Sequence, residues 1–199
     1  MLKIYLIIII TEFDMRIITG KAKGIKLLTL DGLATRPTSE RSKEAIFSML
    51  QFEIEGRVVL DLFAGSGQMG LEAVSRGARC AYLVDSGREA FGIIKKNIEK
   101  THLADGCVAV CEDSLSFLNK QSGLEKYDIV FLDPPYATDF IGEALDLLWK
   151  KALIKDTSYI ICESDRFDLL DNENSVRFET IKTMKHGIAH ISVLKMRGV

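Results

Sequence analysis

The stretch 58–70 reads VVLDLFAGSGQMG and decides the fold, because an apolar run of strand type leads directly into a glycine-rich turn. Gly65 and Gly67 permit a tight turn in which a ligand can approach the backbone. Gly70 allows the helix expected near 68–76 to pack closely. A strand, a GxGxxG turn and a helix are typical of nucleotide-binding α/β folds, and alone they fit a nicotinamide dinucleotide as well as any other nucleotide.

Strand and helix patterns alternate on the C-terminal side of this stretch. After a first strand at 58–60, the expected strands are 81–84, 107–111, 129–132 and 159–162, and the expected helices are 87–101, 114–120 and 138–150. Continuous apolar strands that alternate with helices predict a parallel sheet covered on both faces. Two late strands, near 176–182 and 188–196, have no helix between them and predict an antiparallel edge. The fold is therefore expected to be α/β, with a mostly parallel sheet of seven strands.

The segment before this body is short and basic. Residues 16–19 and 25–28 resemble two strands around the turn 20–24, which predicts a small hairpin. Pro37 interrupts extended structure, and Thr38 or Ser39 is expected to cap a helix that runs to about Phe52.

Charge is unevenly distributed along the chain. Residues 15–45 carry seven Lys or Arg against three acids, whereas 46–199 carry 18 against 23, within a formal net charge of −2. A basic segment on an acidic body suggests a polyanionic partner, although such charges usually only solvate a surface.

Length and composition limit the class of protein. A chain of 199 residues with 47% hydrophobic and 27% charged residues is ordinary for one soluble globular domain. The apolar run at 2–10 is too short to span a bilayer and has no signal-peptide cleavage site. It is either an added strand or the product of a start codon upstream of Met15, and the second interpretation is favoured. The four cysteines have no zinc spacing, which predicts reduced, mostly buried thiols in a cytoplasmic protein, and no metal is expected.

Carboxylates end or follow the first three expected strands. Asp61 lies where a dinucleotide fold usually has apolar residues, and a carboxylate there attracts a cation such as the ammonium of S-adenosylmethionine; alternatively Asp61 forms a turn or caps a helix. Asp85 follows Gly67 by 18 residues, where an acid can accept hydrogen bonds from ribose hydroxyls. Asp113 is suited to an adenine amine or, equally, to capping the helix expected at 114–120.

The sequence Asp133-Pro134-Pro135-Tyr136 directly follows the expected strand at 129–132. Two prolines remove two N–H donors, so this turn presents carbonyl and carboxylate acceptors. An exocyclic amine on a nucleobase is a poor nucleophile because its lone pair is delocalised. Acceptors for both of its hydrogens favour the form with a free lone pair, and Tyr136 can stack on the base and hold it in line with a methyl donor. Alternatively, residues 133–136 only form a rigid turn. If they instead bind the amine, the target base must leave its stack in the nucleic acid to reach them.

These two motifs resemble the class I S-adenosylmethionine-dependent amino-methyltransferases. The upstream segments MRIITGKAKG at 15–24 and RPTSER at 36–41 are similar, more narrowly, to bacterial 16S ribosomal RNA guanine-N2 methyltransferases of the RsmD type. The resemblance covers residues 15–197. The sequence departs from the family pattern at 68–69 and at 86–87, and none of the key carboxylates lies at these positions.

The resemblance implies a Rossmann-like class I methyltransferase that binds S-adenosylmethionine. Three segments are expected along the chain: an extension at 1–14, a basic β-hairpin arm at 15–36 and a methyltransferase domain at 37–199. The expected partner is 16S ribosomal RNA or the assembling small ribosomal subunit. The protein is expected to be a monomer and to have no contact with membranes. Cofactor contacts are expected from Asp61, Phe63, Ala64, Gly65, Gly67, Asp85 and Asp113, catalysis from Asp133, Pro134, Pro135 and Tyr136, and RNA contacts from Arg16, Lys21, Lys23, Arg36 and Arg41.

Three other functions remain open from the residues themselves. The same chemistry can act on another base, such as the N6 amine of adenine. A nicotinamide-dependent oxidoreductase would use the glycine-rich turn, but Asp61 argues against it and no Tyr-x-x-x-Lys or His-based hydride site is evident. A non-catalytic RNA-binding module would fit the basic segment and leave residues 133–136 unexplained.

Overall fold

The computed structural model describes residues 15–29, 40–135, 139–171, 173–187 and 189–198. Seven strands form one sheet in the order β3-β2-β1-β4-β5-β7-β6. The strands are β1 (Val58–Asp61), β2 (Cys80–Asp85), β3 (Cys107–Cys111), β4 (Tyr127–Leu132), β5 (Ile154–Ser164), β6 (Phe178–His186) and β7 (Ala189–Met196). β1 to β5 are parallel, and β7 runs antiparallel to both β5 and β6. The predicted α/β fold with an antiparallel C-terminal edge is confirmed.

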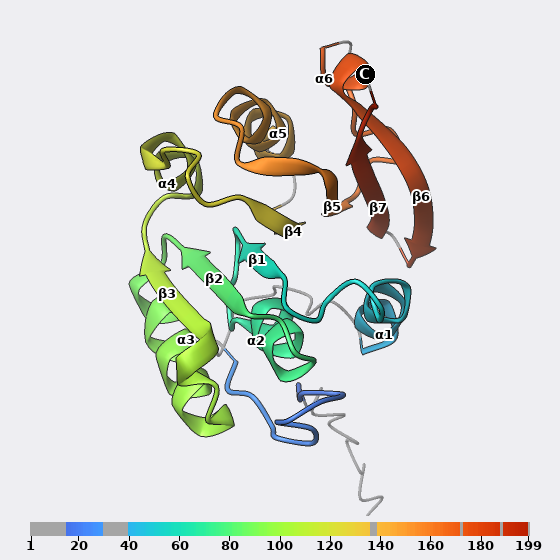
Figure 1. The fold of residues 1–199 in the computed structure, drawn as a ribbon. Helices are drawn as coiled ribbons and strands as arrows, with labels where there is room; N and C mark the ends of the chain where they lie inside the picture. Colours follow the sequence, from blue (N-terminus) through green and yellow to red (C-terminus); the bar gives the residue numbers. More distant parts are fainter. Residues whose placement is uncertain (1–14, 30–39, 136–138, 172, 188, 199) are drawn as a thin grey trace, which may run out of the picture.

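Helices cover both faces of the sheet. They are α1 (Glu40–Met49), α2 (Gln68–Ser75), α3 (Arg88–Thr101), α4 (Ser114–Lys120), α5 (Phe140–Lys150) and the short α6 (Asn174–Arg177). α4 and α5 lie above the sheet in Figure 1, and α1, α2 and α3 lie below it. Because successive side chains of a strand point to opposite faces, Val59 and Leu83 join the core below the sheet, whereas Leu60 and Val84 join the core above it. Burial on both faces is why these strands are continuously apolar.

Four elements differ from the sequence-based expectation, among them β6, which spans Phe178–His186 rather than the region near 176–182. β5 begins at Ile154 rather than near 159, because Ile154 already pairs with Tyr127 of β4; the register then shifts, and the exposed, polar Lys155, Asp156 and Thr157 lie in this irregular stretch. α1 ends at Met49, short of the expected Phe52, and α6 was not predicted. The expected helix caps, Thr38 and Ser39, lie outside the described residues.

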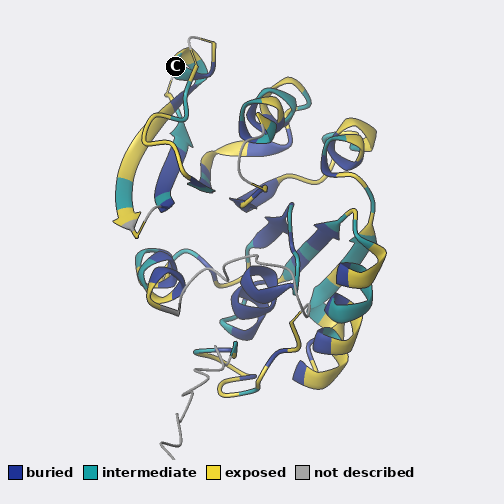
Figure 2. Cartoon of the chain, turned by 180° about the vertical axis from the view of Figure 1, so that it is seen from behind, coloured by how far each residue is buried: buried dark blue, intermediate teal, exposed yellow. Residues whose placement is uncertain are grey.

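Residues 15–28 form the predicted hairpin, which packs along α2. One antiparallel bridge joins Arg16 to Lys26, and Leu27 N donates to Met15 O at 2.7 Å. The hairpin covers the outer side of α2, so every residue of that helix is buried, as Figure 2 shows. At the hairpin tip, a Cβ on Gly20 would lie 1.8 Å from the carbonyl oxygen of Ser75, so only glycine allows this approach.

A buried carboxylate fixes the hairpin to the helix. Glu72 is fully buried on α2 and accepts hydrogen bonds from the backbone N–H groups of Ile18 at 2.7 Å and Thr19 at 3.0 Å. Arg76 Nε lies 2.7 Å from the same carboxylate, and the buried Lys43 of α1 lies 3.7 Å away. Lys43 also donates to the carbonyl of Arg16 at 2.6 Å. The hairpin backbone therefore supplies hydrogen bonds to a buried ion cluster that consists of Glu72, Arg76 and Lys43.

Two further expectations concern membrane-spanning helices and the burial of the thiols. None of the helices within the described ranges combines the length and hydropathy needed to cross a membrane. The four cysteines are free, but the expectation that they are mostly buried is wrong: only Cys162 is buried, Cys80 and Cys107 are half-buried, and Cys111 is exposed. Cys111 ends β3, and its position at the sheet edge exposes it.

Candidate active site

Four aspartates gather at the carboxyl edge of the sheet. Asp61 ends β1 and Asp85 ends β2, whereas Asp113 and Asp133 follow β3 and β4 by two residues and one residue. These strands are neighbours in the order β3-β2-β1-β4 and run parallel, so their carboxyl ends lie along one edge. The crevice outside the carboxyl ends of parallel strands is where α/β proteins bind ligands.

The glycine-rich turn after β1 is held against β2. Ala64 N donates to Val84 O at 2.9 Å, and Gly67 N donates to Ala64 O at 2.6 Å. Gly65 and Gly67 both have positive φ, at 54° and 80°. Apart from its chain neighbours, no described atom lies within 4 Å of the position that a Cβ at Gly65 would take. The turn therefore leaves open space next to its backbone, as a bound nucleotide requires.

Asp61 is buried beneath the first turn of α2. Its Oδ2 accepts a hydrogen bond from Gly70 N at 3.0 Å, so the turn-forming role considered for Asp61 is present in the structure. Burial raises its pKa from 3.8 to about 7; the Gly70 N–H lowers it, and the nearby Asp85 charge raises it. A cation placed beside this carboxyl group would stabilise its charged form. Gly70 packs closely as predicted, because a Cβ there would lie 2.1 Å from Leu83 Cδ2.

Asp85 organises the neighbouring backbone. Its Oδ2 accepts from Gly65 N at 2.8 Å, and its Oδ1 accepts from Gly87 N at 2.8 Å. One carboxylate thus joins the turn after β1 to the start of α3. Asp113 is exposed and caps α4, with its side chain accepting from Ser116 N at 2.9 Å. This contact is the helix-capping role considered from the sequence.

The turn after β4 lies beside the turn after β1. Asp61 is paired with Phe131 in the sheet, so Asp133 follows two residues further, about 7 Å along the strand direction. The Phe63 and Phe140 rings lie 6.0 Å apart and connect the two turns on the side of α5. Asp133 and Pro135 are exposed and Pro134 is buried, whereas Tyr136 lies outside the described residues.

The expected RNA-contacting residues occupy several places. Lys21 and Lys23 are exposed at the hairpin tip, and Lys21 N donates to Ser75 O at the C-terminal end of α2. Arg16 is exposed in the bridge of the hairpin, and Arg41 is exposed on α1. Arg36 lies outside the described residues. The hairpin tip therefore lies at the end of α2 that is remote from the carboxyl edge, and the eight residues of α2 span about 12 Å.

Contacts that the sequence did not indicate support the glycine-rich turn, and they centre on Asn97. Asn97 of α3 is fully buried, and its Nδ2 donates to Ser66 O at 2.9 Å and to Leu28 O at 3.0 Å. Its Oδ1 accepts from Leu28 N at 2.8 Å. Ser66 Oγ also donates to Met15 Sδ at 3.1 Å. An Asn on the otherwise apolar face of an amphipathic helix is the sequence feature that could have indicated this role.

Comparison with known proteins places this arrangement in a family. The family model described as "Conserved hypothetical protein 95" matches residues 15–195. The ribosomal RNA small subunit methyltransferase D of Escherichia coli K12 is 36% identical over 152 residues, covering 76% of this chain and 75% of that protein. The solved structure of yhhF from Escherichia coli is 31% identical, with a TM-score of 0.81 over 94% of this chain and 99% of that one.

A more distant structure shares the fold. SMU.776, which was solved in complex with SAH, is 15% identical and has a TM-score of 0.60 over 77% of this chain and 49% of that one. The length matched by the family model, together with the identity and coverage of its relatives, decides the assignment that the motifs at 15–24, 36–41, 61–67 and 133–136 predicted. This chain belongs to the family described as "Conserved hypothetical protein 95", which is the family of the ribosomal RNA small subunit methyltransferases D.

Proposed function

We propose that this chain transfers a methyl group from S-adenosylmethionine to the exocyclic N2 amine of a guanine in 16S ribosomal RNA. The observation that carries the proposal is the side-by-side placement of a nucleotide-type turn and an acceptor-rich turn, Asp133-Pro134, at one sheet edge. The substrate is free 16S ribosomal RNA or the assembling small subunit, and the protein is expected to act as a monomer in the cytoplasm.

The residues of the first turn fit S-adenosylmethionine. The open space beside Gly65 accommodates a ligand that touches backbone, and Asp61 offers a buried carboxyl group to an ammonium. Asp85 keeps Gly65 in place and can accept hydrogen bonds from ribose hydroxyls. Phe63 and Ala64 line the same turn together with Gly67. Asp113 can accept a hydrogen bond from the adenine amine. When bound, this cofactor supplies an electrophilic methyl group on a sulfonium.

The second turn prepares the amine. Asp133 and the Pro134 carbonyl each accept one hydrogen bond from the guanine amine, which concentrates its lone pair on nitrogen and directs it toward the cofactor side. Pro135 removes a donor that would compete for these acceptors. Tyr136 stacks on the extruded base, at a cost of a few kcal/mol for unstacking. Rate enhancement then comes from positioning and electrostatics.

The amine loses one proton when its new bond to carbon forms. The methylated amine is acidic at that moment, so Asp133 can receive the proton and pass it to water. A carboxylate suffices for this step, because no strong base is needed. Asp133 is exposed, which gives the proton a path to solvent.

Family membership decides between the other functions considered. A nicotinamide-dependent oxidoreductase and a non-catalytic RNA module are not retained, because the family is one of methyltransferases. Methylation of the adenine N6 amine uses the same acceptor geometry, and the relative named for small-subunit ribosomal RNA favours an RNA target.

The test is methylation of ribosomal RNA in vitro, followed by nuclease digestion and mass spectrometry of the nucleosides. N2-methylguanosine in 16S ribosomal RNA is expected, with the modified position mapped from the fragments. N6-methyladenosine, or no methylated nucleoside on either naked RNA or small-subunit particles, would refute the proposed function.

A further inference from the structure

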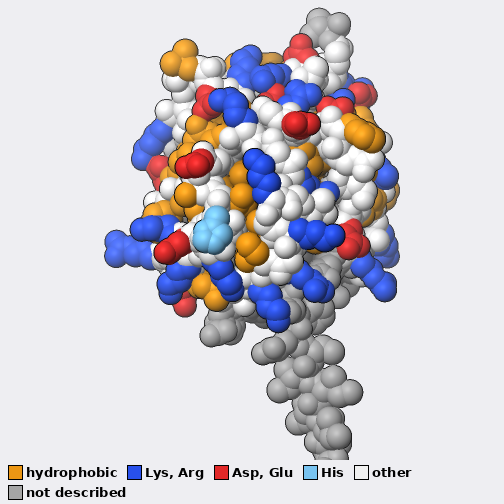
Figure 3. All heavy atoms as spheres, turned by 60° about the horizontal axis from the view of Figure 1, so that its bottom comes forward, with side chains coloured by type: hydrophobic (Ala, Val, Ile, Leu, Met, Phe, Trp, Pro, Cys, Tyr) orange, Lys and Arg blue, Asp and Glu red, His pale blue; other side chains and the backbone are white. Residues whose placement is uncertain are grey.

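A second row of positive charge lies beside the hairpin. Residues 15–29 and 88–101 together contain eight Lys or Arg and two Glu, in a chain whose formal net charge is −2. Arg88, Lys95, Lys96 and Lys100 of α3 are all exposed. Figure 3 shows Lys and Arg side chains spread over the face on which the hairpin and α3 lie.

Asn97 fixes the position of α3 relative to the hairpin. Its side chain makes three hydrogen bonds, to Leu28 N, Leu28 O and Ser66 O, at 2.8, 3.0 and 2.9 Å. Ile94 and Ile98 turn toward the core below the sheet, so the residues one position before and three positions after Asn97 lie on the hairpin flank of the helix. Those residues are Lys96 and Lys100, about 6 Å apart along the helix axis.

These lysines are not neutralised by local partners. Within the part of the chain that the structure describes, no ion pair involves Lys21, Lys23, Lys96 or Lys100. On the opposite face of the sheet, Lys120 and Lys150 are each paired with a carboxylate. Glu89 and Glu99 are the acids of α3, so the four exposed bases of this helix outnumber its acids two to one.

We infer that Lys96 and Lys100 of α3 form, with Lys21 and Lys23 of the hairpin, one phosphate-binding surface for the RNA substrate. This inference rests on the proposed function and extends RNA contact beyond the segment that the sequence indicated. α3 begins at Arg88, three residues after Asp85, so this surface starts at the cofactor edge and runs away from it. RNA that follows the surface therefore leads to the edge at which the target base must enter.

The test measures the affinity for a 16S ribosomal RNA fragment across a salt series. Lys96→Ala/Lys100→Ala is compared with the matched control Lys182→Ala/Lys185→Ala, in which two exposed lysines lie on β6 at the other edge of the sheet. Each lost phosphate contact lowers the slope of log K against log salt by roughly 0.7 to 0.9. We expect the α3 variant to lose about 1.5 slope units and on the order of tenfold affinity near 0.1 M salt.

Three outcomes separate the inference from the proposed function. A reduced slope for the α3 variant alone, with unchanged affinity for S-adenosylhomocysteine, supports the surface. Equal slopes for wild type and the α3 variant refute the role of α3, even when the wild type methylates RNA. A wild type that neither binds nor methylates ribosomal RNA refutes the proposed function as well. Ala is a good helix former, so loss of folding is not expected to obscure the result.

Discussion

Asp61 is a residue whose ionisation decides what it can bind. Its pKa of about 7 in the folded protein lies above the ordinary value of 3.8, because burial penalises its charge. The folded state therefore binds this proton more tightly than the unfolded state does. Its contribution to stability is full below about pH 3.8 and is lost as the pH rises through about 7.

The pKa of Asp61 predicts a pH-dependent cofactor affinity. An ammonium pairs with the charged carboxylate, so the Kd of S-adenosylhomocysteine is expected to rise up to about tenfold per pH unit below pH 7. Isothermal titration calorimetry from pH 5.5 to 8 measures this dependence. Asp61→Asn should bind more weakly and show a flat profile; a flat wild-type profile would contradict the assigned ammonium contact.

Asp133 is expected to matter for chemistry and not for cofactor binding. Asp133→Ala removes one of the two acceptors of the amine, and loss of a positioned catalytic group lowers kcat by about two or more decades. Steady-state methylation kinetics give kcat, and calorimetry gives the Kd of S-adenosylhomocysteine, which should be unchanged. Near-normal turnover by this variant would refute the role of Asp133.

Asn97 acts through the backbone of Ser66 and is a positioning residue. Asn97→Asp keeps the acceptor for Leu28 N, but it removes the amide donor to Leu28 O and Ser66 O and places a carboxyl group against both carbonyls in a buried site, at a cost of about 1–3 kcal/mol or more. The Kd of S-adenosylhomocysteine is expected to rise about tenfold. Ser75→Ala is the matched control, because it loosens the hairpin at the other end of α2, far from the turn. An equal effect of both variants would indicate a general loss of stability only.

At the scale of elements, the hairpin, α1 and α2 behave as one packed unit. Glu72 satisfies two hairpin N–H groups and two cationic side chains within a fully buried site. Removing this carboxylate leaves the N–H groups of Ile18 and Thr19 without their acceptor and takes an ion-pair partner from Arg76 and Lys43. The hairpin is therefore attached to α2 by buried polar contacts along its length.

Glu72→Ala is expected to destabilise the protein by about 3–5 kcal/mol, the usual cost of removing one partner of a buried ion pair. For a chain of this length that lowers Tm by roughly 10 °C, measured by circular dichroism or calorimetry. Arg79→Ala is the control, since the Arg79–Glu125 pair is largely exposed and contributes at most about 1 kcal/mol. A similar small shift for both would show that the hairpin does not depend on Glu72.

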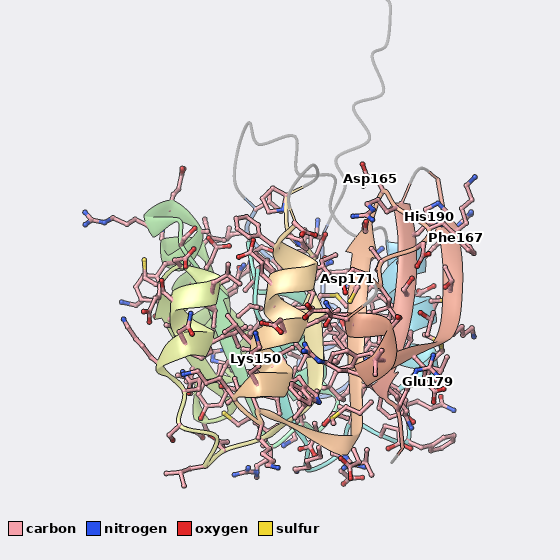
Figure 4. The ribbon with its side chains drawn as sticks, turned by 90° about the horizontal axis from the view of Figure 1, so that it is seen from above. Lys150, Asp165, Phe167, Asp171, Glu179 and His190 are labelled. Atoms are coloured by element: carbon pink, nitrogen blue, oxygen red, sulfur yellow. The ribbon has the colours of Figure 1, made fainter. Side chains whose placement is uncertain are left out.

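At the scale of the whole molecule, the carboxyl edge of the sheet lies between helices that cover its opposite faces. The cofactor turn belongs to the side of α2 and α3, whereas the turn after β4 leads into α5 on the other side. Figure 4 looks onto the α5 face and shows Asp165, Phe167 and His190 at one end, remote from Lys150 and Glu179. Asp165 directly follows β5, so this end is the carboxyl edge of the sheet.

Ligand-induced stabilisation tests the cofactor class for the folded molecule as a whole. S-adenosylhomocysteine at 100 times its Kd should stabilise the protein by about 2.7 kcal/mol. NAD and NADP at the same concentration should leave Tm unchanged, because Asp61 disfavours a pyrophosphate. A thermal shift assay with the three ligands measures the difference. Stabilisation by NAD and none by S-adenosylhomocysteine would overturn the cofactor assignment.

The sequence by itself determined the order of strands and helices along the chain and the position of each motif at the end of a strand. Apolar runs, turn glycines and strand-ending aspartates are local features, and parallel strands bring their carboxyl ends together whatever the details of packing. The sequence placed Asp61, Asp85, Asp113 and Asp133 at or just after the ends of expected strands, and the parallel sheet brings those strand ends to one edge.

Only the tertiary structure decided which distant residues support that edge. The sequence alone distinguishes neither Glu72 nor Asn97, and their roles follow only from the hairpin that packs against them. Burial of a polar side chain depends on partners 50 to 70 positions away in the sequence, such as Ile18 and Leu28. The raised pKa of Asp61 has the same origin, because it follows from the packing that removes water from the carboxyl group.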